Sequence, residues 1–347
     1  MSLVCAPLAS AEFTDPLDAP AITSALAEHG LINGLARAGK RLVAVGERGH
    51  ILYSDDQANT WQQASVPVRS DLTAVSFGDA THGWAVGHDG VVLATTDAGK
   101  SWMKQLDGRR VGPLVADYYA RQRPSDLDDP AYAKLQAAAQ RLVDEGPDKP
   151  FLDVWFADSR RGFVVGAFNL ILETDDGGVH WTPWLDRTEN PGDLHFYAIR
   201  RIGAAVYVAG EQGLLLKLDP DTRRFRALTV PYRGTLFGVA GDADALVVFG
   251  LRGSAFVSTD AGVHWQLLRN DSKGSLAAAT HDASGHLIIA SQSGELLRFA
   301  PGRLQIEPTE PRVPASTILG LPGGAMLSGG ASGLHRLMPQ PPVMPHE

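Results

Sequence analysis

The fold is decided by the stretch Gly87-His-Asp-Gly90-Val-Val-Leu-Ala-Thr95-Thr-Asp97-Ala-Gly99-Lys-Ser-Trp102. Nearly intact copies of this pattern begin at Gly46, Gly166 and Gly250, and degraded copies begin at Gly210, Ser291 and Gly330. The seven starts lie 41, 79, 44, 40, 41 and 39 residues apart. A repeat of about 40 residues built from short strands is typical of propeller blades. We therefore predict an all-β, seven-bladed β-propeller.

Each repeat contains the elements of one four-stranded sheet. In the second repeat an alternating run, Leu72–Phe77, precedes a second run, Gly83–Val86. The Gly-x-x-Gly element then turns the chain, because glycine accepts the positive φ of tight turns. A third run, Val91–Leu93, leads into a Ser/Thr-x-Asp-x-Gly-x-x-Trp segment, the Asp-box of BNR repeats. One such sheet cannot bury both of its faces, so neighbouring sheets are expected to stack around an axis.

The Asp-boxes predict turns rather than a catalytic site. The carboxylate of each box can accept hydrogen bonds from turn amides, and the tryptophan opens the fourth strand. His180 and His264 occupy the same position in two boxes, which indicates a surface turn residue rather than a metal ligand. We predict a structural role for the pairs Asp56 and Trp61, Asp97 and Trp102, Asp176 and Trp181, and Asp260 and Trp265.

Composition narrows the classes of function. The chain has 347 residues, which would favour two domains, but the repeat predicts one, over residues 12–338. The formal net charge of −8 argues against a nucleic-acid or anionic-membrane binder. No apolar run reaches about 18 residues, so no membrane-spanning helix is expected. We predict a monomer without cofactor or metal.

The two ends of the chain do not follow the repeat pattern. Residues 1–11 resemble the tail of a secretory signal, with cleavage after Ala11, although the usual basic region is missing. Either the start is set too late, which would explain the missing basic region, or the segment is a disordered end. Cys5 is the only cysteine, and Val4 is larger than the residue that usually precedes a lipidated cysteine. We predict a periplasmic or otherwise exported protein without disulfides or lipid anchor, and a disordered tail at 339–347.

Ring closure needs one more strand than the seventh repeat provides. Three strand-like runs, at Thr317–Gly320, Ala325–Leu327 and Leu334–Leu337, are followed by a proline-rich tail. We predict that the segment Glu12–Asp18 supplies the fourth strand and closes the ring, since closure removes exposed strand edges.

The 79-residue spacing holds about 38 extra residues, roughly Asp107–Lys149. Asp129, Pro130 and Gly146 bracket a segment with an acidic N-cap, proline at the first helical position and glycine beyond the end. A second, weaker helix is predicted over Leu114–Arg121. We expect a helical hairpin inserted between the second and third blades.

The hairpin and the Gly-x-x-Gly turns are expected to share one face of the propeller. Variable side chains within the turns would surround the mouth of the central channel, and converging side chains on a rigid scaffold form a binding surface. The alternative is that they are solvated turn residues and the hairpin is a tolerated insertion. The candidate protein-binding residues are Arg48, His88, Asp89, Phe168, Glu211, Arg252 and Gln292, with Tyr118 and Tyr119 in the hairpin.

Two longer runs carry a family resemblance: Asp71-Leu-Thr-Ala-Val-Ser-Phe-Gly-Asp-Ala-Thr-His-Gly-Trp-Ala-Val-Gly87 and Phe151-Leu-Asp-Val-Trp-Phe-Ala-Asp-Ser-Arg-Arg-Gly-Phe-Val-Val-Gly166. With the Asp-boxes, residues 31–338 resemble the photosystem II stability/assembly factor family. The resemblance implies a seven-bladed, exported, non-enzymatic propeller that helps a membrane complex assemble. It also implies an arginine-rich client-binding patch, for which the candidates are Arg160-Arg161, Arg200-Arg201 and Arg223-Arg224.

The alternative class is a glycoside hydrolase, because sialidases also combine propellers with Asp-boxes. Sialidases carry an Arg-Ile-Pro segment, whereas here Arg201-Ile202 is followed by Gly203. Other glycosidases need two carboxylates about 5–10 Å apart, for which Asp89 and Glu211 are the candidates. We therefore predict a non-enzymatic, extracytoplasmic scaffold that binds a protein client, such as a membrane complex or transporter, with a sialidase-like enzyme as the alternative.

Overall fold

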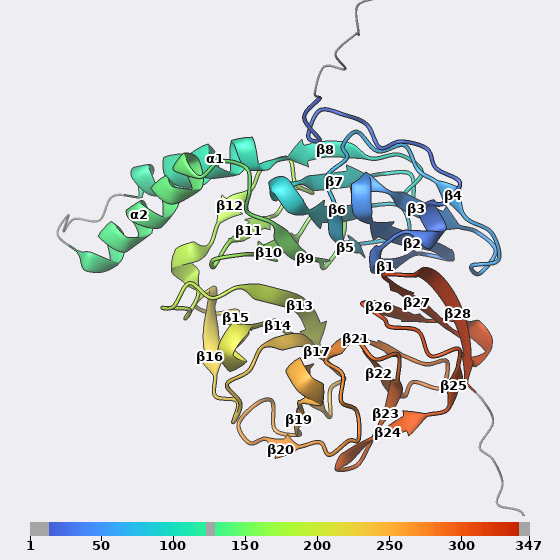
Figure 1. The fold of residues 1–347 in the computed structure, drawn as a ribbon. Helices are drawn as coiled ribbons and strands as arrows, with labels where there is room; N and C mark the ends of the chain where they lie inside the picture. Colours follow the sequence, from blue (N-terminus) through green and yellow to red (C-terminus); the bar gives the residue numbers. More distant parts are fainter. Residues whose placement is uncertain (1–13, 123–128, 340–347) are drawn as a thin grey trace, which may run out of the picture.

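The computed structural model describes residues 14–122 and 129–339 and consists of seven four-stranded sheets arranged in a ring (Figure 1). The first strand of each of blades 1 to 6, and β26 in blade 7, line the central channel. In each of the first six blades the strands follow chain order from the channel outwards. The predicted seven-bladed propeller is confirmed.

Blades 1 to 3 comprise β1 (Ile32–Ala38), β2 (Arg41–Gly46), β3 (Ile51–Ser54) and β4 (Gln62–Gln63); β5 (Leu72–Phe77), β6 (Gly83–Gly87), β7 (Val92–Thr95) and β8 (Met103–Leu106); and β9 (Phe151–Phe156), β10 (Gly162–Gly166), β11 (Ile171–Thr174) and β12 (Thr182–Pro183). Blades 4 and 5 comprise β13 (Phe196–Ile202), β14 (Ala205–Gly210), β15 (Leu215–Asp219) and β16 (Arg224–Leu228); and β17 (Leu236–Gly241), β18 (Leu246–Gly250), β19 (Ala255–Ser258) and β20 (Gln266–Leu267). Blades 6 and 7 comprise β21 (Leu276–His281), β22 (Leu287–Ser291), β23 (Leu296–Ala300) and β24 (Arg303–Glu307); and β25 (Thr309–Glu310), β26 (Thr317–Gly320), β27 (Met326–Gly330) and β28 (Gly333–Pro339).

The hydrophobic core lies between adjacent blades. Every residue of β6, β10, β18, β22 and β27 is buried. These strands, each second from the channel, are covered on both faces by neighbouring sheets, which explains why their sequences are predominantly apolar rather than alternating. The sheets therefore stabilise one another around the ring.

The two glycines of each Gly-x-x-Gly turn are needed for different reasons. At the first glycine the backbone is extended, but a Cβ on Gly87 would lie 2.2 Å from the carbonyl oxygen of Asp71, and one on Gly46 would lie 1.9 Å from that of Leu31. The second glycine adopts the left-handed conformation, as Gly213 does with φ of 79°. The expected positive φ therefore applies to the second glycine, whereas the first permits a close backbone approach.

The Asp-box carboxylates hold the turn between the third and fourth strands. Asp56 accepts hydrogen bonds from the amide and hydroxyl of Thr60, at 2.9 and 2.6 Å, and from the hydroxyl of Ser54 at 2.8 Å. These bonds, above all from the Thr60 hydroxyl, lower the pKa of Asp56 to about 2. The amide of His264 likewise lowers the pKa of Asp260, and the Nδ1 atom of His264 lies 2.6 Å from that carboxylate.

We expect acid to weaken this turn, and the variant Asp56→Asn to isolate the effect. The pKa of Asp56 is about 2 in the folded chain, below the unfolded value of about 3.9. Its contribution is therefore complete above pH 4 and is lost as the pH falls towards 2. Thermal denaturation from pH 7 to about 2 should show the wild type above the variant at neutral pH, with the two converging in acid as the pH falls through the folded pKa of Asp56. A constant difference in melting temperature would refute this assignment.

The ring closes differently from the prediction. The fourth strand of blade 7 is β25, which precedes β26 in the chain and pairs with the outer edge of β28. The described part of the predicted closing segment instead forms a turn, in which the Asp18 amide donates to the carbonyl of Asp15. Leu17 is buried against blades 1 and 2. The prediction was wrong because the two-residue strand β25 carries no periodic signal of its own.

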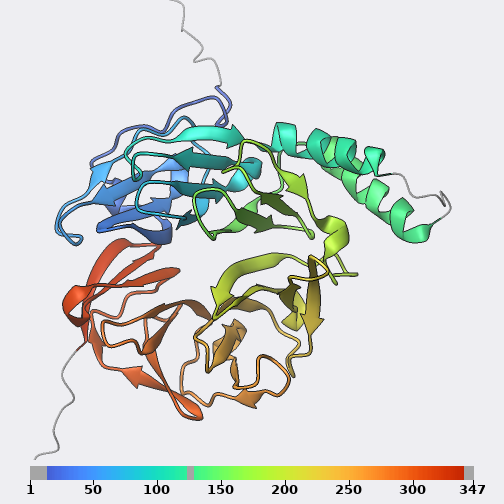
Figure 2. The ribbon, with the colours of Figure 1, turned by 180° about the vertical axis from the view of Figure 1, so that it is seen from behind.

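The predicted helical hairpin is confirmed between blades 2 and 3. Helix α1 (Gly108–Arg121) and helix α2 (Pro130–Asp144) pack together and lie at the outer side of the ring in both views (Figures 1 and 2). Helix α1 begins earlier than the expected Leu114, because the side chain of Asp107 caps it by accepting the amide of Arg109 at 3.1 Å. Residues 1–11 and 340–347, with the proposed signal segment, lie outside the described residues.

Candidate functional site

Each Gly-x-x-Gly turn is hydrogen-bonded to the residue that precedes the innermost strand of the same blade. The first amide after the leading glycine donates to the carbonyl just before that strand, as His88 does to Asp71 at 2.9 Å and Glu211 to His195 at 3.1 Å. The turns and the connections between blades therefore share one face, which we call the turn face. Helix α1 contacts the turn η3 (His88–Gly90), so the hairpin reaches this face as expected.

The seven turn residues named from the sequence differ in their surroundings. Arg48, His88, Phe168, Arg252 and Gln292 are exposed. Asp89 accepts the hydroxyl of Ser70 at 2.6 Å, and Glu211 accepts the amide of His195 at 2.9 Å. Only Gln292 of the seven contributes to the lining of the central cavity. The carboxylates of Asp89 and Glu211 thus brace the turns of two different blades.

Two tyrosines attach the hairpin to blade 3. Tyr119 is 1% exposed, and its hydroxyl donates to Asp186 at 2.8 Å. Burial raises the pKa of Tyr119. Tyr118 packs edge-on against Tyr119, with ring centroids 5.0 Å apart, and its hydroxyl accepts from Arg187. Tyr119 is therefore inaccessible to a partner and serves as an anchor of the insertion.

A groove of about 650 Å³ separates α2 from the turn between β10 and β11 and from the segment between β12 and β13. We call it the hairpin groove. Its apolar wall on the helix is formed by Tyr132, Leu135 and Ala138, and its opposite wall by Phe168 and Leu185. The groove therefore joins one exposed turn residue named from the sequence to the inserted helix. The other lining residues are Gln122, Asp129, Ala131, Lys134, Asn169, Asp186, Thr188, Glu189, Asn190, Pro191 and Asp193.

Phe168 is held at the edge of this groove by its backbone and neighbours. It adopts a left-handed φ of 53° and is 55% exposed. Its ring packs edge-on against His195, with centroids 4.4 Å apart. A left-handed backbone is uncommon for a bulky residue, so the surrounding structure fixes the ring in an outward position.

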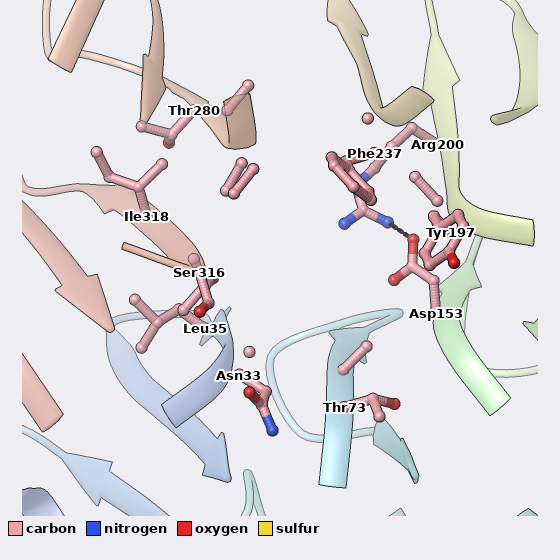
Figure 3. A pocket seen from close by; sticks show the side chains of 18 of the residues that line it. Asn33, Leu35, Thr73, Asp153, Tyr197, Arg200, Phe237, Thr280, Ser316 and Ile318 are labelled. Atoms are coloured by element: carbon pink, nitrogen blue, oxygen red, sulfur yellow. Dashed lines mark hydrogen bonds and ion pairs between the residues drawn. The ribbon is translucent and has the colours of Figure 1, made fainter. Parts of the chain in front are cut away.

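The central cavity, about 370 Å³, is lined by the innermost strands of all seven blades (Figure 3). Asp153 of β9 is 3% exposed and accepts hydrogen bonds from Arg200 and, at 2.7 Å, from the amide of Ile199. Burial raises the pKa of Asp153, while the guanidinium of Arg200 opposes that shift. The pair ties blade 3 to blade 4 inside the channel.

A β-bulge that recurs in six blades directs further side chains into this cavity. Near the start of the first strand in blades 1 to 6, one residue is skipped in the pairing with the second strand. A bulge redirects the side chain of the extra residue. Here every skipped residue lines the cavity: Asn33, Thr73, Leu152, Tyr197, Phe237 and Ala277. The sequence alone missed these residues, because they are identified only once the strand register is known.

The three arginine pairs occupy different environments. Arg200 lies in the channel, whereas Arg161 pairs with Asp158 at 2.8 Å in the turn between β9 and β10. Arg223 pairs with Glu173 at 2.6 Å and lies over the ring of Trp184. Over residues 14–122 and 129–339, no group of three or more His, Cys, Asp or Glu side chains is arranged to hold a metal. None of the helices described is long and apolar enough to cross a membrane.

Comparison with protein families gives one match that spans most of the ring. The model described as "Photosynthesis system II assembly factor YCF48" matches residues 15–111 and 133–315. The unmatched residues between them, 112–132, lie in the helical hairpin and the segment between its helices. The hairpin therefore interrupts the match to the family.

Individual relatives match a shorter part. The chain is 29% identical over 150 residues to "Photosystem II assembly lipoprotein Ycf48" of Synechococcus sp. (strain CC9902) and 30% identical over 155 residues to that of Parasynechococcus marenigrum (strain WH8102). Each alignment spans 41% of this chain and 44% of the relative.

Solved structures show the same fold over nearly the whole chain. A structure titled "YCF48 bound to D1 peptide" has a TM-score of 0.63 and 15% identity, covering 90% of this chain and 95% of its own. The WD40 propeller domain of Doa1 has a TM-score of 0.64 and 9% identity, covering 94% and 97%. At these identities the structures support the propeller fold.

Proposed function

This chain belongs to the Ycf48 family of photosystem II assembly factors, and we propose that it is a rigid, non-enzymatic scaffold that binds a protein client during assembly of a membrane complex. The observation that carries the proposal is the family match, which extends over the blades on both sides of the hairpin. A relative in this family is titled as bound to a peptide, which supports a protein client rather than a small substrate.

The geometry supports binding of a protein client rather than catalytic turnover of a glycoside. The two carboxylates named for a glycosidase brace separate turns and do not line the central cavity. The buried carboxylate that does line it, Asp153, is engaged by Arg200 and the amide of Ile199. The turn face instead presents an exposed aromatic, a groove and exposed polar side chains on a closed ring, which suits recognition of a polypeptide.

We further propose that the protein acts as a monomer outside the cytoplasm, with a membrane complex or transporter as its client. The relatives are named lipoproteins, which supports export. The small residues Ala9-Ser10-Ala11 support cleavage after Ala11.

Affinity capture tests the assembly role. The tagged full chain, crosslinked in the cells that encode it, should be recovered from the extracytoplasmic side and should enrich newly synthesised subunits of one membrane complex. Pulse-chase labelling should show that these subunits leave the protein as the complex matures, because an assembly factor binds intermediates. Enrichment no greater than that of a tag-only control would refute the proposal. So would turnover of chromogenic glycosides that Asp89→Asn or Glu211→Gln abolishes.

A further inference from the structure

We propose that the hairpin groove binds an extended segment of a partner protein that carries large apolar side chains flanked by lysine or arginine. This inference rests on the proposed scaffold function and specifies the chemistry of the client segment. It concerns a surface that exists only because a helical hairpin is inserted beside blade 3.

The apolar part of the groove provides a seat for the apolar side chains. Tyr132, Leu135 and Ala138 are partly buried on α2, and they face Phe168 and Leu185 across the groove. The position of Phe168 in its turn is occupied by Arg48, Asp89, Gln212 and Arg252 in the turns of other blades. An exposed aromatic ring held by a rigid backbone loses little freedom on binding, which is the behaviour of an interface anchor.

The charges of the groove favour lysine or arginine on either side of the apolar residues of the client segment. Four carboxylates, Asp129, Asp186, Glu189 and Asp193, line it beside a single cation, Lys134. Lys134 is already bound to Asp193 at 3.1 Å and to the carbonyl of Pro191 at 2.7 Å. Glu189 is paired with Arg226 at 2.8 Å. Lys149 lies over the ring of Phe168 but is paired with Glu145 and Asp148 outside the groove. The four carboxylates therefore exceed the cations Lys134 and Arg226 by two, which leaves a net acidic rim. Such a rim attracts basic side chains and repels acidic ones.

The groove is preformed. Asn169 is 5% exposed, and its side chain bonds to the carbonyl of Leu185, the hydroxyl of Thr188 and the amide of Asn190. Lys134 bridges α2 to the opposite loop through Asp193 and Pro191. Since both walls are braced in the free protein, a client segment would not have to order them.

Peptide binding to the purified full chain tests the inference. The probe is a fluorescein-labelled nonapeptide with Leu-Phe at its centre and two lysines on each side, measured by fluorescence anisotropy. Matched peptides replace the lysines with glutamates or the Leu-Phe pair with serines. We expect saturable binding of the first peptide, weakened by salt, and on the order of tenfold weaker binding of both matched peptides.

Adjacent positions on α2 offer a matched control. Ala138 lines the groove, whereas Ala137 is exposed and does not. Ala138→Arg should weaken peptide binding on the order of tenfold, because the arginine fills part of the groove and repels the lysines of the peptide. Ala137→Arg should leave peptide binding unchanged. Phe168→Asn provides a second groove variant that keeps the fold, since asparagine tolerates the left-handed backbone. It should also weaken binding, with an unchanged thermal melting temperature.

Other outcomes would overturn the inference. These are failure of the lysine peptide to bind, equal binding of the glutamate peptide, or binding that neither Ala138→Arg nor Phe168→Asn alters. Concentration-dependent dimerisation that Ala138→Arg abolishes would assign the groove to a second copy instead. If capture of a membrane complex persists while the peptides fail, only this inference falls. If the peptides bind while capture fails, the assembly role falls and the groove assignment stands.

Discussion

Replacing Trp84 with alanine is expected to lower the free energy of unfolding by about 3–5 kcal/mol, as large-to-small changes of buried aromatics do. Trp84 is 2% exposed and lies at the boundary between blades 2 and 3. Its ring stacks on Phe156 of β9, with centroids 3.4 Å apart and planes within 2°. Its indole N–H donates to the carbonyl of Gly177 at 3.1 Å. The substitution therefore removes both a packing contact and a hydrogen bond between neighbouring sheets.

The variant Trp84→Phe separates these two contributions. It keeps an aromatic ring against Phe156 but removes the N–H donor. The Gly177 carbonyl still accepts the side-chain amide of Gln105 at 2.8 Å, so the expected loss is about 1–2 kcal/mol, from the lost hydrogen bond and the smaller ring. Guanidinium unfolding followed by far-UV circular dichroism measures both variants without relying on the lost fluorophore. Equal stability of Trp84→Ala and the wild type would show that the packing of blade 2 against blade 3 does not depend on the contact between Trp84 and Phe156.

Replacing Tyr119 with alanine is expected to detach the helical hairpin. Tyr119 packs with Val111, Val115, Ala139 and Trp181 in the core cluster that joins the hairpin to blades 2 and 3. Loss of the ring and of its bond to Asp186 should weaken this attachment by about 3–5 kcal/mol. Hydrogen exchange should then show protection of α1 and α2 amides reduced on the order of a hundredfold or more, with strands of blades 5 and 6 unaffected.

Tyr119→Phe serves as the matched control for this result. It keeps the buried ring and removes only the hydroxyl, so hairpin protection should fall about tenfold at most. Unchanged exchange of α1 and α2 in Tyr119→Ala would mean that other contacts hold the hairpin. Because these residues belong to the core, deleting residues 107–149 would expose apolar surface of blade 3, and single substitutions are the cleaner probe.

The turns and helix ends can be predicted from the sequence for a physical reason. The Asp-box bonds of Asp56 and Asp260 join residues at most four positions apart. Helix α2 begins at the proline that follows its Asp129 cap. Such features depend on turn and capping chemistry within a few residues, which the sequence displays directly. The spacing of the repeats then gave the number of blades.

The sequence could only partly anticipate the candidate site. It pointed to Phe168 and to the inserted helices, but it could not show that a groove forms between them or that Tyr119 is buried as an anchor. It named Asp89 and Glu211 as partners across a channel, whereas the structure places Asp153 and Arg200 together there. These pairings join different blades, and no local pattern indicates which side chains meet.

Periodicity and short-range hydrogen bonding in the sequence are sufficient to predict the repeated sheet, the turns that connect its strands and the insertion of two helices. The three-dimensional arrangement was needed to show that β25 completes blade 7, that bulges direct Asn33 and Phe237 into the cavity, and that α2 faces Phe168 across a groove. These features depend on strand register and on contacts between distant segments, which are fixed when the blades pack around the ring.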